Sequence, residues 1–351
     1  MHRWQLAAGA CILGIGLLIA RSSDSMAQPQ TEQQTPQLLQ IAALPAATGE
    51  TNAPPAISRS APTDGSTAQD GSFQSQIDGW IRTLAEQQTE FQSWKDAAWT
   101  RYPLGAGMHG WIVLLHKNGK ELGYMIVGAT EDGKLSLTEY GAGDNPLFSM
   151  QTLYRSLVQL ELIHSDQQSG LTLREDAPAG RSPYDELLAH ESRVERLYYS
   201  PLHAVWKWTQ QNEDVYLDAR TGEQLPLTAQ QFNPLQPYDP RSGLPAAMPP
   251  LEKSLTLASF DPFANMHWIF DSPLPIRSAT SFIEALADGS LPITFTANLY
   301  GRKVLMPYAV TGYHQWKLGS TYVKIEQQGG RYVPFDTLLQ YGSFFRQGSG
   351  A

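Results

Sequence analysis

Two turn-forming dipeptides divide one part of the chain into short apolar runs of similar length. The dipeptides are Asn118-Gly119 and Asp132-Gly133, and the runs that they separate cover residues 111–115, 122–127 and 135–140. Asparagine, aspartate and glycine adopt the positive φ angles of tight turns at low energetic cost. Each dipeptide therefore predicts a hairpin turn, and the three runs predict a three-stranded antiparallel meander.

A helix is predicted directly before this meander. Apolar residues recur at intervals of three and four from Phe73 to Ala98, which is the stripe of an amphipathic helix. Pro103 ends the pattern. Helix and meander together predict a first module over residues 73–145.

The same order of elements recurs further along the chain. Apolar residues between Met150 and Leu162 indicate a second helix, and 193–200, 203–210 and 214–219 are three further strand candidates. A second module of one helix and one meander is therefore predicted over residues 146–227.

The rest of the chain is predicted to hold a linker and a third module. Prolines concentrate in residues 228–258, which is typical of a linker. A helix candidate at 279–287 and the strand candidates after it predict a C-terminal α+β module over 259–346. The predicted fold class is α+β, with tandem modules of one helix packed on a three-stranded antiparallel meander.

The stretch "DVYLDARTGEQLP", residues 214–226, closes the second meander and raises the question of a catalytic loop. Asp, Arg, Thr and Glu together could form a small acid-base site. The same residues are also turn formers, because Asp218 can accept a backbone N–H and Gly222 can supply a left-handed conformation. The turn is the favoured interpretation, since no basic partner is fixed by the spacing.

The end of this strand resembles a known family. Tyr216, Asp218-Ala219 and Thr221-Gly222-Glu223 are similar to the residues that close PepSY and peptidase-propeptide domains, which place one helix against a three-stranded antiparallel sheet. The resemblance covers residues 146–227 and, in architecture alone, residues 73–143. It implies an extracytoplasmic, non-catalytic protein that binds or restrains a peptidase.

The N-terminus predicts export. An uninterrupted apolar run, Leu6–Ala20, follows a short basic start, and Ser25 and Ala27 occupy the small-residue positions that a signal peptidase needs. The run is short for a membrane span, which needs about 20 apolar residues. Residues 1–27 are therefore predicted to be a signal peptide, with an uncleaved membrane anchor through Leu6–Ala20 as the alternative. Residues 28–72 contain no aromatic residue and are predicted to be a disordered linker.

Composition and missing motifs argue against several functions. A formal net charge of −9 without a Lys/Arg-rich run argues against a nucleic-acid binder. Cys11 is the only cysteine, so the exported part has no disulfide and no thiol nucleophile. No zinc-protease, calcium-loop or serine-hydrolase motif is present. We predict no cofactor, no metal site and no catalytic residue, and hence that the protein is not an enzyme.

Three aromatic residues of the second meander are candidate binding residues. Trp206 and Trp208 share one face of a strand, where they could stack on a sugar or clamp a peptide, and Tyr216 lies on the next strand. The alternative, favoured because small α+β modules need bulky cores, is that these side chains fill the interior.

The sequence predicts a non-catalytic binding or regulatory protein of the cell envelope. Its partner is expected to be a protein or peptide, such as a peptidase, and its location the outer face of the cytoplasmic membrane or beyond. The alternatives are an envelope hydrolase acting on peptide or glycan between the second and third modules, and a structural spacer. A cleft that gathers His, Asp and Ser with a perturbed pKa would favour the hydrolase.

Overall fold

The computed structural model describes residues 66–105, 109–163, 193–264, 266–289, 291–317 and 319–346. The predicted signal peptide or anchor at 1–27, and the part of the predicted linker before Ser66, lie outside these residues. No helix among the described residues is long and apolar enough to cross a membrane. The described residues belong to one compact unit that starts at Ser60.

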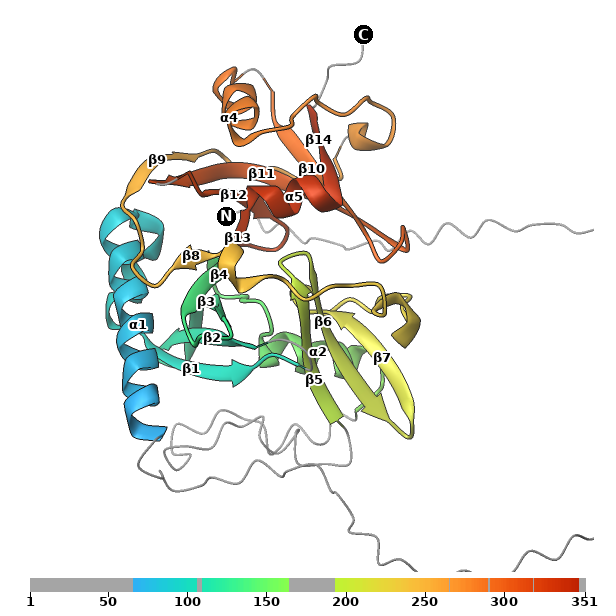
Figure 1. The fold of residues 1–351 in the computed structure, drawn as a ribbon. Helices are drawn as coiled ribbons and strands as arrows, with labels where there is room; N and C mark the ends of the chain where they lie inside the picture. Colours follow the sequence, from blue (N-terminus) through green and yellow to red (C-terminus); the bar gives the residue numbers. More distant parts are fainter. Residues whose placement is uncertain are drawn as a thin grey trace, which may run out of the picture. The chain divides into compact units, whose positions relative to one another are not determined.

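The chain alternates helices with antiparallel strands (Figure 1). The helices are α1 (Ser66–Gln87), α2 (Met150–Gln159), α4 (Ala279–Ala287) and α5 (Phe335–Tyr341), with 3-10 helices η1 (Thr89–Asp96), η3 (Ala229–Gln231), η4 (Pro240–Ser242) and η5 (His267–Ile269). The strands are β1 (Ala98–Pro103), β2 (Gly110–Lys117), β3 (Lys120–Ala129), β4 (Leu135–Ala142), β5 (Arg193–Ser200), β6 (His203–Gln210), β7 (Glu213–Asp218), β8 (Leu244–Pro245), β9 (Leu251–Thr256), β10 (Ile293–Leu299), β11 (Val304–Trp316), β12 (Thr321–Glu326), β13 (Gly330–Pro334) and β14 (Gly342–Arg346).

The strands form two sheets. The large sheet has 11 strands, in the order β1-β2-β3-β4-β13-β12-β11-β10-β14, with β8 paired to β4 and β9 paired to β11. The small sheet is the meander β5-β6-β7. The predicted α+β class is confirmed, and the three strands of the second module form the predicted meander.

Both faces of β2 and β3 are buried, which explains why the sequences of these strands contain continuous apolar runs. Val113 and Met125 point to the face that α1 and η1 cover. Ile112 and Tyr124 point to the opposite face, against α2 and the small sheet. Figure 1 shows α1 and α2 on opposite sides of these strands.

The first module differs from its prediction at both ends of the helix. α1 begins at Ser66, inside the predicted linker, and ends at Gln87 rather than near Ala98. The apolar spacing continues beyond Gln87 because Phe91 and Trp94, in the 3-10 helix η1, pack into the same core. Ala98 begins β1, which pairs with β2, so the meander has four strands instead of three.

The proline-rich residues 228–258, predicted to be a linker, are part of the folded body. Leu244 in β8 pairs with Leu137 and is fully buried, and β9 pairs with β11. Pro245 fits in β8 because this strand has two residues and pairs with β4 alone, so that a missing N–H costs little. The segment therefore crosses the large sheet instead of separating two modules.

The large sheet joins the first and third predicted modules at one narrow seam. β4 and β13 share a single register pair, Tyr140 with Tyr332. The rings of these two tyrosines stack at 5.0 Å with 9° between their planes, and the Tyr140 hydroxyl lies 2.9 Å from Nδ1 of His314. Burial lowers the pKa of His314 to about 3, so this ring is neutral at pH 7. Modules predicted to be separate are thus continuous in one sheet.

A glycine pair tests how closely the seam is packed. A Cβ on Gly141 would come within 2.5 Å of the Gly330 carbonyl oxygen, whereas a Cβ on Gly79, in α1, would meet nothing within 4 Å. We expect Gly141→Ala to lower the free energy of unfolding by about 1–3 kcal/mol through overpacking. Gly79→Ala should raise it by about 0.5–1 kcal/mol through helix propensity. Denaturant melts of the two variants measure these free energies of unfolding. Equal effects of the two substitutions would contradict a close-packed seam.

Candidate functional site

The stretch from Asp214 to Pro226 has the geometry of a turn closed by Asp218. The Asp218 carboxylate accepts hydrogen bonds from the backbone N–H of Arg220, at 2.9 Å, and of Thr221, at 2.8 Å. Gly222 has φ +73° and donates its N–H to the Asp218 carbonyl at 2.9 Å. Oδ1 of the carboxylate is engaged by its own backbone, so this side chain holds the chain reversal.

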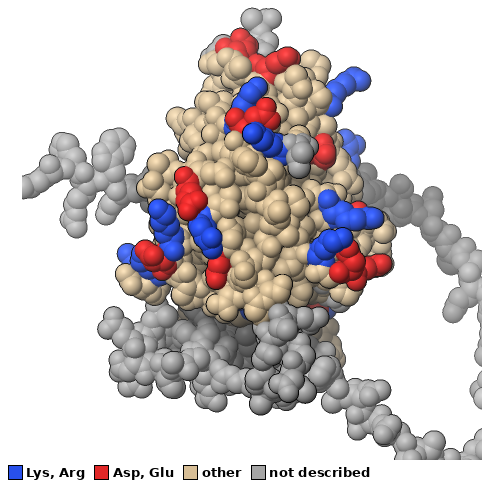
Figure 2. Space-filling view, turned by 60° about the vertical axis from the view of Figure 1, so that its left-hand side comes forward, with Lys and Arg blue, Asp and Glu red and all other residues tan. Residues whose placement is uncertain are grey.

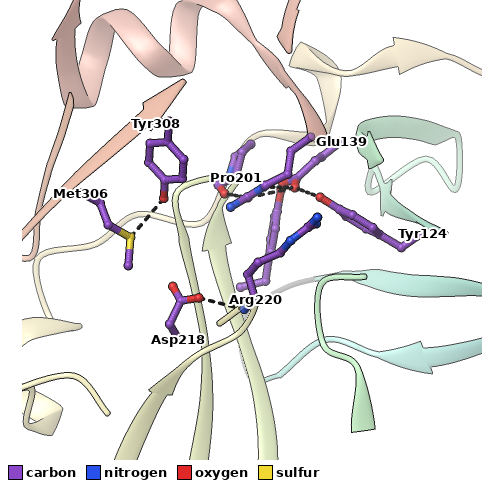
Figure 3. Close-up of polar contacts among 9 residues, drawn as sticks. Tyr124, Glu139, Pro201, Asp218, Arg220, Met306 and Tyr308 are labelled. Atoms are coloured by element: carbon purple, nitrogen blue, oxygen red, sulfur yellow. Dashed lines mark hydrogen bonds and ion pairs between the residues drawn. The ribbon is translucent and has the colours of Figure 1, made fainter. Parts of the chain in front are cut away.

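The Arg220 side chain leaves this turn and enters the interior (Figure 3). Its Nη2 donates to the Gln328 carbonyl at 3.2 Å, which ties the turn to the connection between β12 and β13. The guanidinium lies 6.0 Å from the centre of the Tyr124 ring. Burial lowers the pKa of Arg220, and its Nε and Nη1 have no hydrogen-bond partner among the described residues. Arg220 therefore works as a buried tether between the small sheet and the β12–β13 turn.

Glu139 of β4 is 0% exposed and lies at the centre of a group of buried polar side chains. We call Glu139, Arg331, Tyr124 and Tyr198 the buried polar cluster. Across the seam, the Arg331 Nε donates a hydrogen bond to Glu139 Oε1 at 2.9 Å. The Arg331 Nη2 forms an ion pair with the same oxygen, also at 2.9 Å. The hydroxyls of Tyr124 and Tyr198 also donate to Glu139, the latter at 3.0 Å. Arg331 additionally donates to the carbonyl of Pro201, at the end of β5 (Figure 3).

This cluster brings together three segments that are far apart in the sequence. Glu139 comes from the first predicted module, Tyr198 from the second and Arg331 from the third. Both Glu139 oxygens accept hydrogen bonds and both charged groups are buried, so neither is available to a reacting molecule at the surface. The chemistry of the cluster is structural, because a buried ion pair holds its elements in one arrangement.

The structure corrects the prediction of a binding row at Trp206, Trp208 and Tyr216. Trp206 and Trp208 do share one face of β6, but that face packs against α2 and the large sheet in the core. Tyr216 lies on the other face of the small sheet, where its ring centre is 4.8 Å from that of Phe232. All three side chains are buried, because the small sheet is covered on both faces. None of them can contact a partner at the surface.

The predicted hairpin residues lie in exposed loops between strands. Asn118 and Gly119 have φ angles of 52° and 73° and form the two-residue connection between β2 and β3. Asp132 and Gly133 lie in a five-residue loop, in which Gly133 has φ 76°. These residues shape hairpins and bring no functional groups together.

A Ser–His contact lies between the small sheet and the C-terminal strands. Ser200 Oγ is 2.9 Å from Nδ1 of His203. The imidazole is buried edge-on against the rings of Tyr300 and Tyr341, at 4.9 and 4.5 Å between centres. Burial lowers the pKa of His203 to about 4. Both partners are at most 3% exposed, so this pair has the atoms of a nucleophile and base without access for a substrate.

Three surface clefts are lined by a mixture of polar and apolar residues. Their volumes are about 570, 780 and 470 Å³. Neither Ser200 nor His203 lines any of these three clefts. In the first, the charge of Asp239 is neutralised locally by Arg241 at 2.8 Å. In the second, burial raises the pKa of Glu121, whose carboxylate accepts a hydrogen bond from Ser149 at 2.7 Å.

Among the described residues, no group of three His, Cys, Asp or Glu side chains could hold a metal ion.

The face of the molecule in Figure 2 shows how surface charge is distributed. Blue and red side chains lie next to each other in small groups, separated by wide uncharged areas. Ion pairs of this kind occur among the described residues, as where Lys207 lies 3.2 Å from Glu195 and 3.4 Å from Asp214. Paired charges of this kind create little long-range field on that face.

The unusual surface feature is the connection between β9 and α4, drawn in orange in Figure 1. The described residues include seven large apolar side chains that are exposed, and five of them lie in this connection. These five are Leu257, Phe263, Met266, Ile269 and Phe270, and we call them the apolar loop; the other two are Leu291 and Leu305. Phe270 is 83% exposed. Exposed apolar residues gathered in one place mark interaction surfaces, whereas single ones need no explanation.

Sequence reasoning missed both the buried polar cluster and the apolar loop. A signal for the first was Glu139, the one charged residue of the strand β4. A signal for the second was "FDPFANMHWIF", residues 260–270, an aromatic-rich run next to a proline-rich segment. The sequence could not show that Phe263 and Phe270 of this run are exposed.

A matched pair of glycines tests the turn at Asp218. Gly222 and Gly119 both have φ +73°, but a Cβ on Gly222 would come within 2.0 Å of Ser156 Oγ, while one on Gly119 would meet nothing within 4 Å. We expect Gly119→Ala to cost about 1–2 kcal/mol of stability from backbone strain alone. Gly222→Ala should cost at least 1 kcal/mol more, and Ser156→Ala should recover part of that excess. Thermal and urea melts measure this, and identical losses at the two glycines would argue against the packing of the turn on α2.

Removing the charge of Glu139 tests the buried polar cluster. Glu139→Gln leaves the buried Arg331 without its counter-charge, so we expect a loss of about 3–5 kcal/mol. Tyr198→Phe removes one hydrogen bond and should cost about 1 kcal/mol. Glu195→Gln, in the partly exposed pair with Lys207, is the control and should cost at most about 1 kcal/mol. A loss for Glu139→Gln no larger than that for Glu195→Gln would show that the cluster is dispensable.

Comparison of this chain with protein-family models, with curated proteins and with solved structures finds no match. The resemblance to PepSY and peptidase-propeptide domains therefore stays a prediction from residues 216–223.

Proposed function

We propose that this protein is an exported, non-catalytic binding protein of the cell envelope whose partner is a protein or peptide. The observation that carries the proposal is the apolar loop, where five of the seven exposed large apolar side chains of the described residues are concentrated. Protein interfaces place aromatic residues and methionine at their centre, and Phe263, Met266 and Phe270 have that composition. The export signal predicted at residues 1–27 supports the location in the envelope.

The interior of the protein supports a passive role. The acidic and basic groups around Glu139 are buried and contact one another, and Oδ1 of Asp218 holds its own turn. A catalytic acid or base needs a free position next to its substrate. The buried groups around Glu139 leave no such position, which supports a scaffold that presents a surface.

An envelope hydrolase is the second candidate, and one observation favours it. Ser200 and His203 are 2.9 Å apart and lie between the second and third predicted modules, where the hydrolase was predicted to have its site. The burial of both side chains weighs against it, because a nucleophilic serine must reach a substrate carbonyl.

Photo-crosslinking in the producing cell tests the binding function. With a photo-reactive phenylalanine analogue in place of Phe270, we expect a discrete protein adduct, because this side chain is 83% exposed within the loop. The same analogue in place of Leu305, which is 55% exposed on β11 outside the loop, is the control and should give no such adduct. Equal adducts at both positions, or none at Phe270, would contradict binding through the loop.

A serine-directed fluorophosphonate separates the two candidate functions. We expect no labelling of the folded protein, because Ser200 is 3% exposed. Stoichiometric labelling that Ser200→Ala abolishes, with an unchanged thermal melt, would overturn the binding function in favour of the hydrolase.

A further inference from the structure

The connection that carries the apolar loop is hydrogen-bonded to the large sheet and within itself. The Leu257 N–H donates to the Thr311 carbonyl and the Leu274 N–H donates to the Phe344 carbonyl, both at 2.8 Å, so each end of the connection is hydrogen-bonded to the large sheet. Within the connection, the Trp268 indole donates to the Pro262 carbonyl at 3.0 Å. A surface that is ordered in advance loses little conformational entropy on binding.

The exposed side chains converge on one short turn. The Ile269 N–H donates to the Met266 carbonyl and the Phe270 N–H donates to the His267 carbonyl, both at 3.0 Å, so residues 266–270 wind into a single 3-10 turn. The Phe263 ring contacts Trp268, with 6.4 Å between ring centres. Phe263, Met266, Ile269 and Phe270 are all exposed and lie in this turn or within three residues of its start.

The charges of the connection itself select among the possible occupants. Between Lys253 and Arg277 the chain has no Lys or Arg, and its two charged residues are Asp261 and Asp271. Loops and helices that bind anionic bilayers carry Lys or Arg beside their apolar residues. A second copy of the chain would bring four carboxylates together around the contact, which is a repulsive arrangement. The complementary surface is one with an apolar centre and cationic side chains around it.

We propose that the apolar loop docks on a protein surface whose apolar centre is flanked by Lys and Arg side chains. The inference rests on the proposed binding function and adds the chemistry of the partner. Phe270 and Ile269 enter the apolar centre, where they lose contact with water, and Asp261 and Asp271 face the flanking cations. Apolar burial supplies the affinity, and the carboxylates supply the selectivity for charge.

Two synthetic helical peptides serve as probes for the whole chain. They share one face of Leu and Phe, and their flanking positions are all Lys in one peptide and all Glu in the other. By fluorescence anisotropy we expect the Lys peptide to bind at least tenfold more tightly than the Glu peptide. Phe270→Ser should weaken Lys-peptide binding about thirtyfold or more, as for a central anchor. Leu305→Ser removes a comparable exposed side chain outside the loop and should leave binding unchanged.

The carboxylates and the competing occupants are tested in the same experiment. The double substitution Asp261→Asn and Asp271→Asn should reduce the preference for the Lys peptide without lowering the thermal melt. Equal affinity for both peptides, or no effect of Phe270→Ser, would overturn the inference. Co-sedimentation with phosphatidylcholine or phosphatidylglycerol vesicles that Phe270→Ser abolishes would replace it with lipid binding. A dimer in sedimentation analysis that the same substitution dissolves would replace it with self-association.

Failure of this inference is distinguishable from failure of the binding function. A discrete protein adduct at Phe270 in cells, combined with no preference between the peptides, would keep the function and reject the cationic partner surface. Absence of the adduct would reject the function itself.

Discussion

The ion pair of Glu139 and Arg331 is the contact on which the arrangement of the chain depends. β4 and β13 meet at a single register pair, too little backbone bonding to hold two halves of a sheet in one orientation. Glu139 and Arg331 bridge the seam on one face, and the stacked rings of Tyr140 and Tyr332 cover the other. Because Arg331 also donates to Pro201, the same cluster fixes the small sheet against the large one. Stability at this position requires that each buried charge keep its partner.

The turn at Asp218 provides the second contact between the small sheet and the large sheet. Its carboxylate fixes the reversal after β7, and Arg220 then carries the turn onto the β12–β13 connection through Gln328. The stretch that invited a catalytic interpretation is therefore a connector between sheets. The polar groups of this part of the interior hold three segments together, and the exposed large apolar side chains of the described residues are concentrated between β9 and α4.

Local elements were predictable from the sequence, and their assembly was not. The hairpins around Asn118-Gly119 and the strands β5 and β6 follow from turn chemistry and alternation, which are properties of neighbouring residues. The junction of β4 with β13 joins residues almost two hundred positions apart, and no local pattern encodes it. Trp206 and Trp208 share the predicted face of β6, but alternation cannot tell whether such a face meets solvent or α2. The same limit hid the apolar loop, since exposure depends on what packs nearby.

The three segments predicted as separate modules are expected to unfold as one cooperative body. Differential scanning calorimetry of the whole chain measures this most directly. One transition is expected, with a calorimetric enthalpy equal to the van't Hoff enthalpy, as in a two-state domain. Two or more resolved transitions, or a calorimetric enthalpy well above the van't Hoff value, would show that the seam and the buried polar cluster do not couple the segments.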